Sequence, residues 1–330
     1  MADINSNIDQ PDSLPLAIEA INLSKRYSGL IAVDGLSLQI QTGELFGFLG
    51  PNGAGKSTTM KMVTGFVPPS AGRVSVCGLD IDQSSLEARR CIGYLPEGAP
   101  CYPEMTPSSF LEFIADIRGL TRAERKTRLD SVIEALHLGP VLNQSIDTLS
   151  KGFKRRVGLA QAILHDPKVL ILDEPTDGLD PNQKHEVREL IRSMAANKLI
   201  VLSTHILEEV EAVCTRAIII ANGSILADDT PEQLARRSRF HNAVRLRVGA
   251  NESFDQVQAA LVQLISIDSV EVDRGSRTIT ALARTETRDG ETWQQVFDLI
   301  SRQNWDITGL QLEVGQLDQV FREITGGSHA

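Results

Sequence analysis

The chain has 330 residues and a formal net charge of −10 at pH 7, with 33 Lys and Arg against 43 Asp and Glu. A negative balance without a long basic block argues against a surface that holds a nucleic acid backbone, so no nucleic acid partner is expected. No stretch approaches the roughly 20 apolar residues of a membrane-spanning helix, and the polar, acidic N-terminus lacks the pattern of a signal peptide, so the sequence predicts a cytoplasmic protein.

The first elements predicted along the chain are strands. Residues 1–16 are expected to form a disordered tail. Apolar and polar residues alternate over residues 36–40, which is the pattern of a half-buried strand. Residues 44–49 form a short apolar strand that runs into a glycine-rich turn, and a helix is predicted from Lys56 onward.

The middle of the chain is predicted to be helical, from about residue 99 to residue 165. Apolar residues recur there at helical spacing, for example over residues 110–117. Two continuous apolar strands follow at residues 169–172 and 199–202, with a helical stretch between them. Strands that are buried on both faces and joined through a helix are typical neighbours in a parallel sheet.

The composition changes after Arg239, and the pattern becomes strand, helix, strand, strand, helix, strand over residues 244–312. This order predicts a small ferredoxin-like domain. Ser253 and Gln256 are spaced as a capping box at the start of its first helix. A last helix is predicted over residues 317–324.

Residues 50–57 fit the pattern G-x-x-x-x-G-K-[ST] of a phosphate-binding loop, between a strand and a helix as that motif requires. Its glycines allow main-chain N–H groups to converge on phosphate oxygens at the N-terminus of the helix. Lys56 is expected to reach the β and γ phosphates, and the Ser57 hydroxyl to hold Mg²⁺. The predicted nucleotide contacts of this loop are Gly50, Asn52, Gly53, Ala54, Gly55, Lys56, Ser57 and Thr58.

Two acidic residues, Asp173 and Glu174, follow the apolar strand at residues 169–172. Side chains at the carboxyl end of a buried parallel strand project into the crevice where open α/β sheets bind ligands. Asp173 is predicted to hold Mg²⁺, directly or through water, and Glu174 to act as the general base toward the attacking water.

A second candidate anion site is the run Leu149-Ser150-Lys151-Gly152-Phe153, which precedes a predicted helix. The Ser150 hydroxyl and the Gly152 N–H could contact a phosphate at that helix N-terminus. The run resembles the signature Leu-Ser-Gly-Gly-Gln of the ATP-binding-cassette (ABC) family. In that family the phosphate bound by the signature belongs to the nucleotide of the partner subunit.

The resemblance extends over roughly residues 17–238 and implies roles for three further residues. Tyr27 lies where the family stacks an aromatic ring on adenine, with core packing as the alternative. Asp180 lies in the family's loop that links the two sites. His205 is similar to the switch histidine that contacts the γ-phosphate. The implied catalytic set is therefore Lys56, Glu174 and His205.

The sequence departs from the usual family pattern at three positions. Glu97 replaces the glutamine of the loop that joins the sheet to the helical subdomain; its carboxylate can still offer oxygen to Mg²⁺ but adds negative charge. Lys151 and Phe153 replace residues of the signature. These substitutions resemble those of ABC-2 type exporters. Two charged clusters are interpreted as solvated faces without a catalytic role: Lys154, Arg155 and Arg156, and Glu208, Glu209 and Glu211.

The resemblance implies an α/β phosphate-loop fold, with an ABC ATPase domain over residues 17–238 and a small α+β ferredoxin-like domain over residues 239–330. The ATPase domain would combine a mixed sheet core, an antiparallel β subdomain and a helical subdomain at about residues 99–165. The implied ligands are ATP and Mg²⁺.

The implied function is that of the ATP-hydrolysing subunit of a transporter, lying peripherally on the cytoplasmic face of the cell (inner) membrane. It would pair as a homodimer or a heterodimer and act on a separate integral membrane permease. The alternatives are a non-transport ABC ATPase that acts on nucleic acid or ribosomes, a phosphate-loop kinase or GTPase, and a non-catalytic nucleotide sensor.

Overall fold

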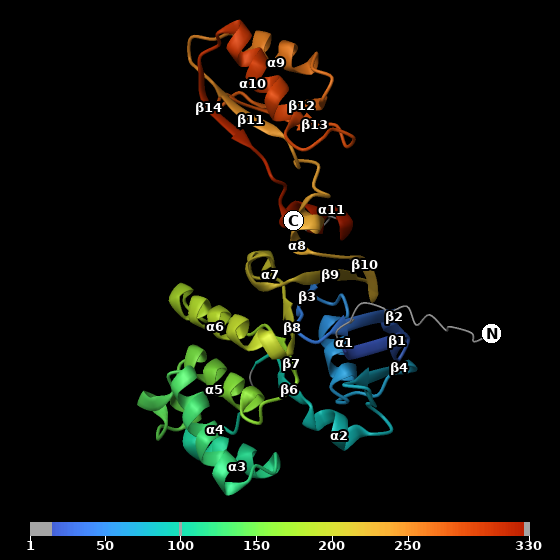
Figure 1. Cartoon of the computed structure of the whole chain (residues 1–330), viewed down its shortest axis with the longest axis vertical. Helices are drawn as coiled ribbons and strands as arrows, with labels where there is room; N and C mark the ends of the chain where they lie inside the picture. Colours follow the sequence, from blue (N-terminus) through green and yellow to red (C-terminus); the bar gives the residue numbers. More distant parts are fainter. Residues whose placement is uncertain (1–14, 99–100, 327–330) are drawn as a thin grey trace, which may run out of the picture. The chain divides into compact units, whose positions relative to one another are not determined.

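The computed structural model describes residues 15–98 and 101–326 (Figure 1). Most of the predicted N-terminal tail, residues 1–14, lies outside the described residues, and the first strand begins at Leu16. The contacts within the chain divide it into two compact units. The units are Met1–Asp228 and Asp229–Ala330.

The first unit contains a six-stranded sheet with the order β10-β9-β3-β8-β7-β6. Its strands are β3 (Leu45–Leu49), β6 (Ile92–Leu95), β7 (Val169–Asp173), β8 (Leu199–Thr204), β9 (Arg216–Ala221) and β10 (Ser224–Asp229). The two apolar runs predicted to be parallel neighbours are β7 and β8, and their parallel pairing confirms that prediction. Every residue of β7 is buried, as expected for a central strand covered on both faces.

A second sheet in this unit is antiparallel, with the order β2-β1-β4-β5. Its strands are β1 (Leu16–Tyr27), β2 (Leu30–Gln41), β4 (Ala71–Val76) and β5 (Leu79–Asp80). The alternation predicted for residues 36–40 is confirmed, because Leu36, Leu38 and Ile40 are buried and the residues between them are exposed. The turn between β1 and β2 leaves Tyr27 and Leu30 exposed.

The helices of the first unit are α1 (Lys56–Val63), α2 (Ser85–Arg90), α3 (Pro107–Ile117), α4 (Arg122–Ala135), α5 (Lys151–Ile163), α6 (Pro181–Met194) and α7 (Leu207–Val213). Figure 1 shows α3, α4 and α5 gathered as a helical group, drawn in green. Thr106 with Ser109 and Thr121 with Glu124 form capping boxes that start α3 and α4. Among the described residues, none of the helices combines the length and the apolar character that crossing a bilayer requires.

Two hydrophobic cores cover the opposite faces of the six-stranded sheet. Leu170 and Leu172 of β7 face a core shared with α3, α4, α5 and α6. Val169 and Ile171, the alternate residues of the same strand, face a core shared with α1 and the antiparallel sheet. The sheet is thus fixed from both sides, and its strands end in the polar residues described below.

The second unit contains a four-stranded antiparallel sheet with the order β12-β13-β11-β14. Its elements are α8 (Pro231–Ala235), β11 (Val244–Val248), α9 (Phe254–Val262), β12 (Ile267–Asp273), β13 (Thr278–Ala283), α10 (Glu291–Gln303), β14 (Ile307–Leu312) and α11 (Leu317–Ile324). The division of the chain falls after residue 228 and not after residue 238, because α8 packs against α11 of the second unit.

The capping box predicted at α9 is wrong. Ser253 is the N-cap residue, but its side chain makes no cap hydrogen bond. The first turn is closed instead by the main chain, where the N–H of Val257 donates to the oxygen of Ser253 at 3.1 Å.

Candidate nucleotide site

The phosphate loop connects β3 to α1, as predicted. Two of its positions require glycine, each for its own steric reason. Gly55 is the N-cap of α1 with φ +105°, and a Cβ there would lie 2.5 Å from the main-chain oxygen of Ala32. A Cβ at Gly50 would lie 2.4 Å from the main-chain oxygen of Ile220. Only glycine fits these two positions, because the loop is pressed against β2 on one side and β9 on the other.

Lys56 is buried at the start of α1, with 8% of its surface exposed. Its Nζ donates to the main-chain oxygens of Gly50 at 2.6 Å and Pro51 at 3.2 Å. Burial lowers the pKa of Lys56, and the negative charges of three nearby carboxylates partly oppose that shift. These carboxylates are Glu174, Asp173 and Glu97. A cation held only by carbonyl oxygens is well placed to exchange them for phosphate oxygens.

A cavity of about 470 Å³ opens beside this loop. It is lined by Tyr27, Leu30, Ile31, Ala32, Pro51, Asn52, Gly53, Ala54, Gly55, Lys56, Ser57, Thr58 and Glu97. Nine of these were predicted from the sequence; Leu30, Ile31, Ala32 and Pro51 were not. Leu30 and Ile31 are apolar but 67% and 45% exposed, and their position three and four residues after Tyr27 was the available hint. Tyr27 itself is 42% exposed, so it is not a core residue.

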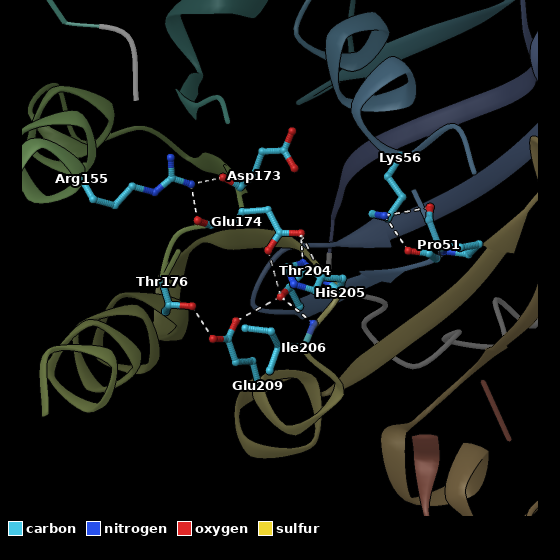
Figure 2. Close-up of polar contacts among 11 residues, drawn as sticks. Pro51, Lys56, Arg155, Asp173, Glu174, Thr176, Thr204, His205, Ile206 and Glu209 are labelled. Carbon is cyan, nitrogen blue, oxygen red and sulfur yellow. Dashed lines mark hydrogen bonds and ion pairs between the residues drawn. The ribbon is translucent and has the colours of Figure 1, made fainter. Parts of the chain in front are cut away.

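Two of the three catalytic candidates, Glu174 and His205, meet at the carboxyl ends of β7 and β8 (Figure 2). Oε1 of Glu174 accepts the main-chain N–H of His205 at 3.1 Å and lies 2.8 Å from Nδ1 of the same residue. The main-chain N–H of Glu174 donates to the oxygen of Ser203 at 2.8 Å. Asp173, the last residue of β7, is 3% exposed. The side chain of His205 is 61% exposed and faces solvent beyond the carboxylate.

The backbone of Glu174 is in the left-handed region, with φ +51°. For a residue other than glycine, this backbone conformation costs about 1–2 kcal/mol. Such conformations concentrate at functional sites, where the surroundings hold them in place. Here the conformation turns the chain sharply after β7.

The signature residues form a second cluster, at the start of α5 and α6. Ser150 is the exposed N-cap of α5, and its hydroxyl accepts the N–H of Phe153 at 3.3 Å. Asp180 is the exposed N-cap of α6 and accepts the N–H of Gln183 at 2.9 Å. A Cβ at Gly152 would lie 2.7 Å from Oε1 of Gln183, so the two helix starts are in close contact. Ser150, Gly152 and Asp180 do not line the cavity beside Lys56.

The family model for ABC transporters matches residues 33–177. The linearmycin resistance ATP-binding protein LnrL of Bacillus subtilis is 33% identical over 311 residues, which cover 94% of this chain and 98% of LnrL. The chain belongs to the ABC transporter family. It is an ATP-binding subunit of that family, an ATPase that couples ATP hydrolysis to transport.

Other members of the ABC transporter family match about two thirds of the chain. The Nod factor export ATP-binding protein I of Burkholderia pseudomallei is 40% identical over 66% of this chain and 72% of that protein. A solved structure of the ATP-binding subunit of an ABC transporter is 33% identical, with a TM-score of 0.63 over 67% of this chain and 92% of that one. The structure of cbiO1 from Clostridium perfringens, part of the ABC transporter complex cbiONQ, is 28% identical with a TM-score of 0.61 over 68% of this chain and 92% of that one.

Two of the three basic residues interpreted as a solvated face are buried in this ABC ATPase. Arg155 is 5% exposed and Arg156 is 8% exposed, whereas Lys154 is half-buried. The guanidinium of Arg155 donates to the main-chain oxygen of Pro96 at 3.1 Å and to the main-chain oxygens of Asp173 and Glu174 (Figure 2). No local sequence pattern predicts this burial, because the carbonyl acceptors lie on segments far along the chain.

The interpretation of Glu209 as part of an exposed acidic face is also wrong. Glu208 and Glu211 are exposed, but Glu209 is only 3% exposed. Its carboxylate accepts hydrogen bonds from the hydroxyls of Thr176 and Thr204, which satisfy the buried charge. The short helix α7 turns this one carboxylate toward β8 and the other two toward solvent.

Proposed function

We propose that this ATPase powers export through a separate membrane permease, by closing with a second ATP-binding subunit around ATP. The names of its relatives support this direction of transport, since one is a resistance protein and another exports Nod factor. The observation that carries the proposal is the separation of the two anion sites within one chain. The cavity beside Lys56 includes no residue of the signature cluster, so a single copy leaves it open on one side.

In the proposed nucleotide complex, Lys56 and the main-chain N–H groups of residues 53–58 bind the triphosphate. The exposed ring of Tyr27 is available for stacking on adenine. In a closed dimer, Ser150 and Gly152 of a second subunit would contact the γ-phosphate, and Asp180 would lie at the same interface. The two-fold symmetry of such a dimer completes two sites at once.

Mg²⁺ fits the oxygen donors of the site, which are the Ser57 hydroxyl and the carboxylates of Asp173 and Glu97. No hydrogen bond from the described part of the chain engages the Asp173 carboxylate, so it is available. Across residues 15–98 and 101–326 no cluster of three or more His, Cys, Asp or Glu side chains is suited to a metal ion. Mg²⁺ typically binds one or two carboxylates together with substrate phosphates. When bound, it would neutralise charge on the β and γ phosphates.

For hydrolysis, Glu174 is the proposed general base. A water oxygen attacks the γ-phosphorus, the bond from that phosphorus to the bridging oxygen of ADP breaks, and the carboxylate of Glu174 accepts the water proton. His205 already holds Oε1 of Glu174 and is exposed enough to reach a phosphate. Loss of the γ-phosphate removes the contacts that favour the closed dimer.

The proposed permease site is a cavity of about 320 Å³ in the ATPase unit. It is lined by Thr64, Gly65, Phe66, Arg89, Ile92, Tyr94, Ile114, Ile117, Arg118 and Gln161. Phe66 and Ile117 are 74% and 64% exposed, which is costly in water and is typical of a protein contact. Gln161 of α5 donates to the oxygen of Tyr94 at 2.7 Å, so this cavity adjoins the helix that follows the signature. Docking there would place the subunit peripherally on the cytoplasmic face of the membrane.

For the second unit, we propose a ferredoxin-like fold. The order of elements is strand, helix, strand, strand, helix, strand, and the sheet order β12-β13-β11-β14 supports the proposal.

The test of this function is Glu174→Gln, which keeps the size of the side chain and removes its basicity. We expect ATP binding by calorimetry to be unchanged, ATP turnover to fall by about 10²–10⁴-fold, and ATP to trap a dimer that is visible by analytical ultracentrifugation. Glu208→Gln on the exposed face of α7 is the matched control. Wild-type turnover in Glu174→Gln would rule out the proposed base. Co-purification of the full chain with a polytopic membrane protein tests whether it associates with a permease.

A further inference from the structure

A second carboxylate, that of Glu209, lies behind the Glu174–His205 pair (Figure 2). Glu209 is 3% exposed, and the two threonines that donate to it, Thr176 and Thr204, are 2% and 0% exposed. Thr176 follows Glu174 by two residues, and Thr204 directly precedes His205. Glu209 therefore joins the segments that carry both partners of the pair.

The hydroxyl of Thr204 lies between the two carboxylates. Its Oγ1 is 3.1 Å from Oε2 of Glu209 and 3.4 Å from Oε2 of Glu174. It also accepts the main-chain N–H of Ile206 at 3.1 Å. A hydroxyl has only one proton to donate, and the shorter contact is the one to Glu209.

We propose that Glu209 is a positioning residue for ATP hydrolysis, because it takes the single proton of Thr204 and so leaves Oε2 of Glu174 free to accept the proton of the attacking water. This inference rests on the proposed role of Glu174 as the base. Without Glu209, the Thr204 hydroxyl has its nearest acceptor in Glu174 itself. A hydrogen bond donated to the carboxylate stabilises it and makes it a weaker base.

Both oxygens of the Glu209 carboxylate have a hydroxyl donor. Thr176 donates to Oε1, and Thr204 donates to Oε2 at 3.1 Å. The buried carboxylate is thus satisfied by two neutral donors.

The substitution Glu209→Gln tests the direction of the Thr204 proton. The amide oxygen accepts only one of the two hydroxyls, and the amide nitrogen must face the other. Thr204 has a second acceptor in Glu174, whereas Thr176 has no other hydrogen-bond acceptor within the described residues. The amide nitrogen will therefore face Thr204, and the Thr204 proton will turn to Glu174.

We expect Glu209→Gln in the full chain to lower the kcat for ATP at least tenfold and to change the KM less than twofold. Thr204→Val removes the hydroxyl proton. In the Thr204→Val background, Glu209→Gln should therefore lower kcat by less than a further twofold, so the effects of the two substitutions are not additive. Glu208→Gln, one residue away on the solvent face of α7, should behave as wild type. Thermal unfolding of all variants reports any general loss of stability.

Equal losses of kcat from Glu209→Gln in the wild-type and Thr204→Val backgrounds would mean that Glu209 acts only through stability, and would overturn the inference. Wild-type kcat in Glu209→Gln would also overturn it. Glu174→Gln, measured in parallel, separates failure of this inference from failure of the proposed base. If that variant is inactive while Glu209→Gln is normal, only this inference fails; if Glu174→Gln turns over normally, the proposed base and the inference both fail.

Discussion

The guanidinium group of Arg155 donates a hydrogen bond to the main-chain oxygen of Glu174, across 19 positions of sequence. The same group holds the oxygen of Asp173 and, through its other terminal nitrogen, that of Pro96. One buried cation therefore connects α5, whose N-cap is Ser150, to the end of β7 and to the segment leading to Glu97. The signature helix and the proposed base are thus mechanically linked within one chain.

Arg155→Met should destabilise the protein and lower ATP turnover, because three main-chain oxygens lose a charged donor. We expect a loss of about 2–3 kcal/mol in the free energy of unfolding by urea titration, in line with hydrogen bonds to charged groups. Lys154→Met is the control from the same turn, where only the oxygen of Asp147 loses a donor. Equal stability of the two variants would contradict the anchoring role of Arg155.

Gly55→Ala should cost more stability than Gly53→Ala, although both glycines have positive φ. At Gly53 (φ +81°) a Cβ meets open space, so only backbone strain of about 1–2 kcal/mol is expected. At Gly55 the Cβ would also collide with the main-chain oxygen of Ala32, and the loop must move. The melting temperature should therefore be highest for wild type, lower for Gly53→Ala and lowest for Gly55→Ala. Gly55→Ala should also lose its affinity for ATP. The reverse ranking would refute the steric argument.

Asp180 is the N-cap of α6 and has a proposed role at the dimer interface, and substitutions can separate the two. As the N-cap of α6, it should tolerate Asn, which caps equally well, whereas Asp180→Ala should cost about 1 kcal/mol of stability. If its charge also serves the interface of the proposed dimer, Asp180→Asn should lower ATP turnover several-fold at an unchanged melting temperature. A variant that is normal in both measurements would leave Asp180 with the capping role alone.

Alkaline pH should destabilise the protein through its partly buried thiols. Burial raises the pKa of Cys214 to about 12 and that of Cys101 to about 11, from an ordinary value of 9.0. Above pH 9 the unfolded chain releases these protons while the folded chain keeps them, so the free energy of unfolding falls as pH rises. At pH 10.5 the Cys214 share is about 2 kcal/mol. Urea titrations of Cys214→Ala between pH 8 and 10.5 should show a decline smaller by that amount; a decline equal to that of wild type would contradict it.

The phosphate loop and the strand-terminal acids could be predicted because each is a short contiguous pattern whose chemistry depends on its own backbone. The sheet neighbours β7 and β8 could be predicted for a related reason, since burial on both faces leaves an unbroken apolar run. Glu97 and Tyr27 were found through family resemblance, and both line the cavity.

The residues that were missed depend on partners far along the chain. Glu209 looks like a solvated acid until Thr176, 33 positions earlier, is seen to donate to it. Arg155 looks like a surface cation because the packing of α3, α4 and α6 around α5 has no local signature. Ser253 shows the opposite failure, in which a correct spacing of Ser and Gln gave no side-chain cap because the main chain closed the turn.

The left-handed backbone of Glu174 makes thermal stability and ATP turnover favour different residues at position 174. Glycine at position 174 would relieve the conformation, and asparagine would tolerate it better than glutamate does. A library of variants screened only for survival of heating should therefore become enriched in chains that have lost this glutamate. A screen that also demands ATP turnover should keep Glu174, because this residue is the proposed base, and the strained conformation then persists at the cost of thermal stability.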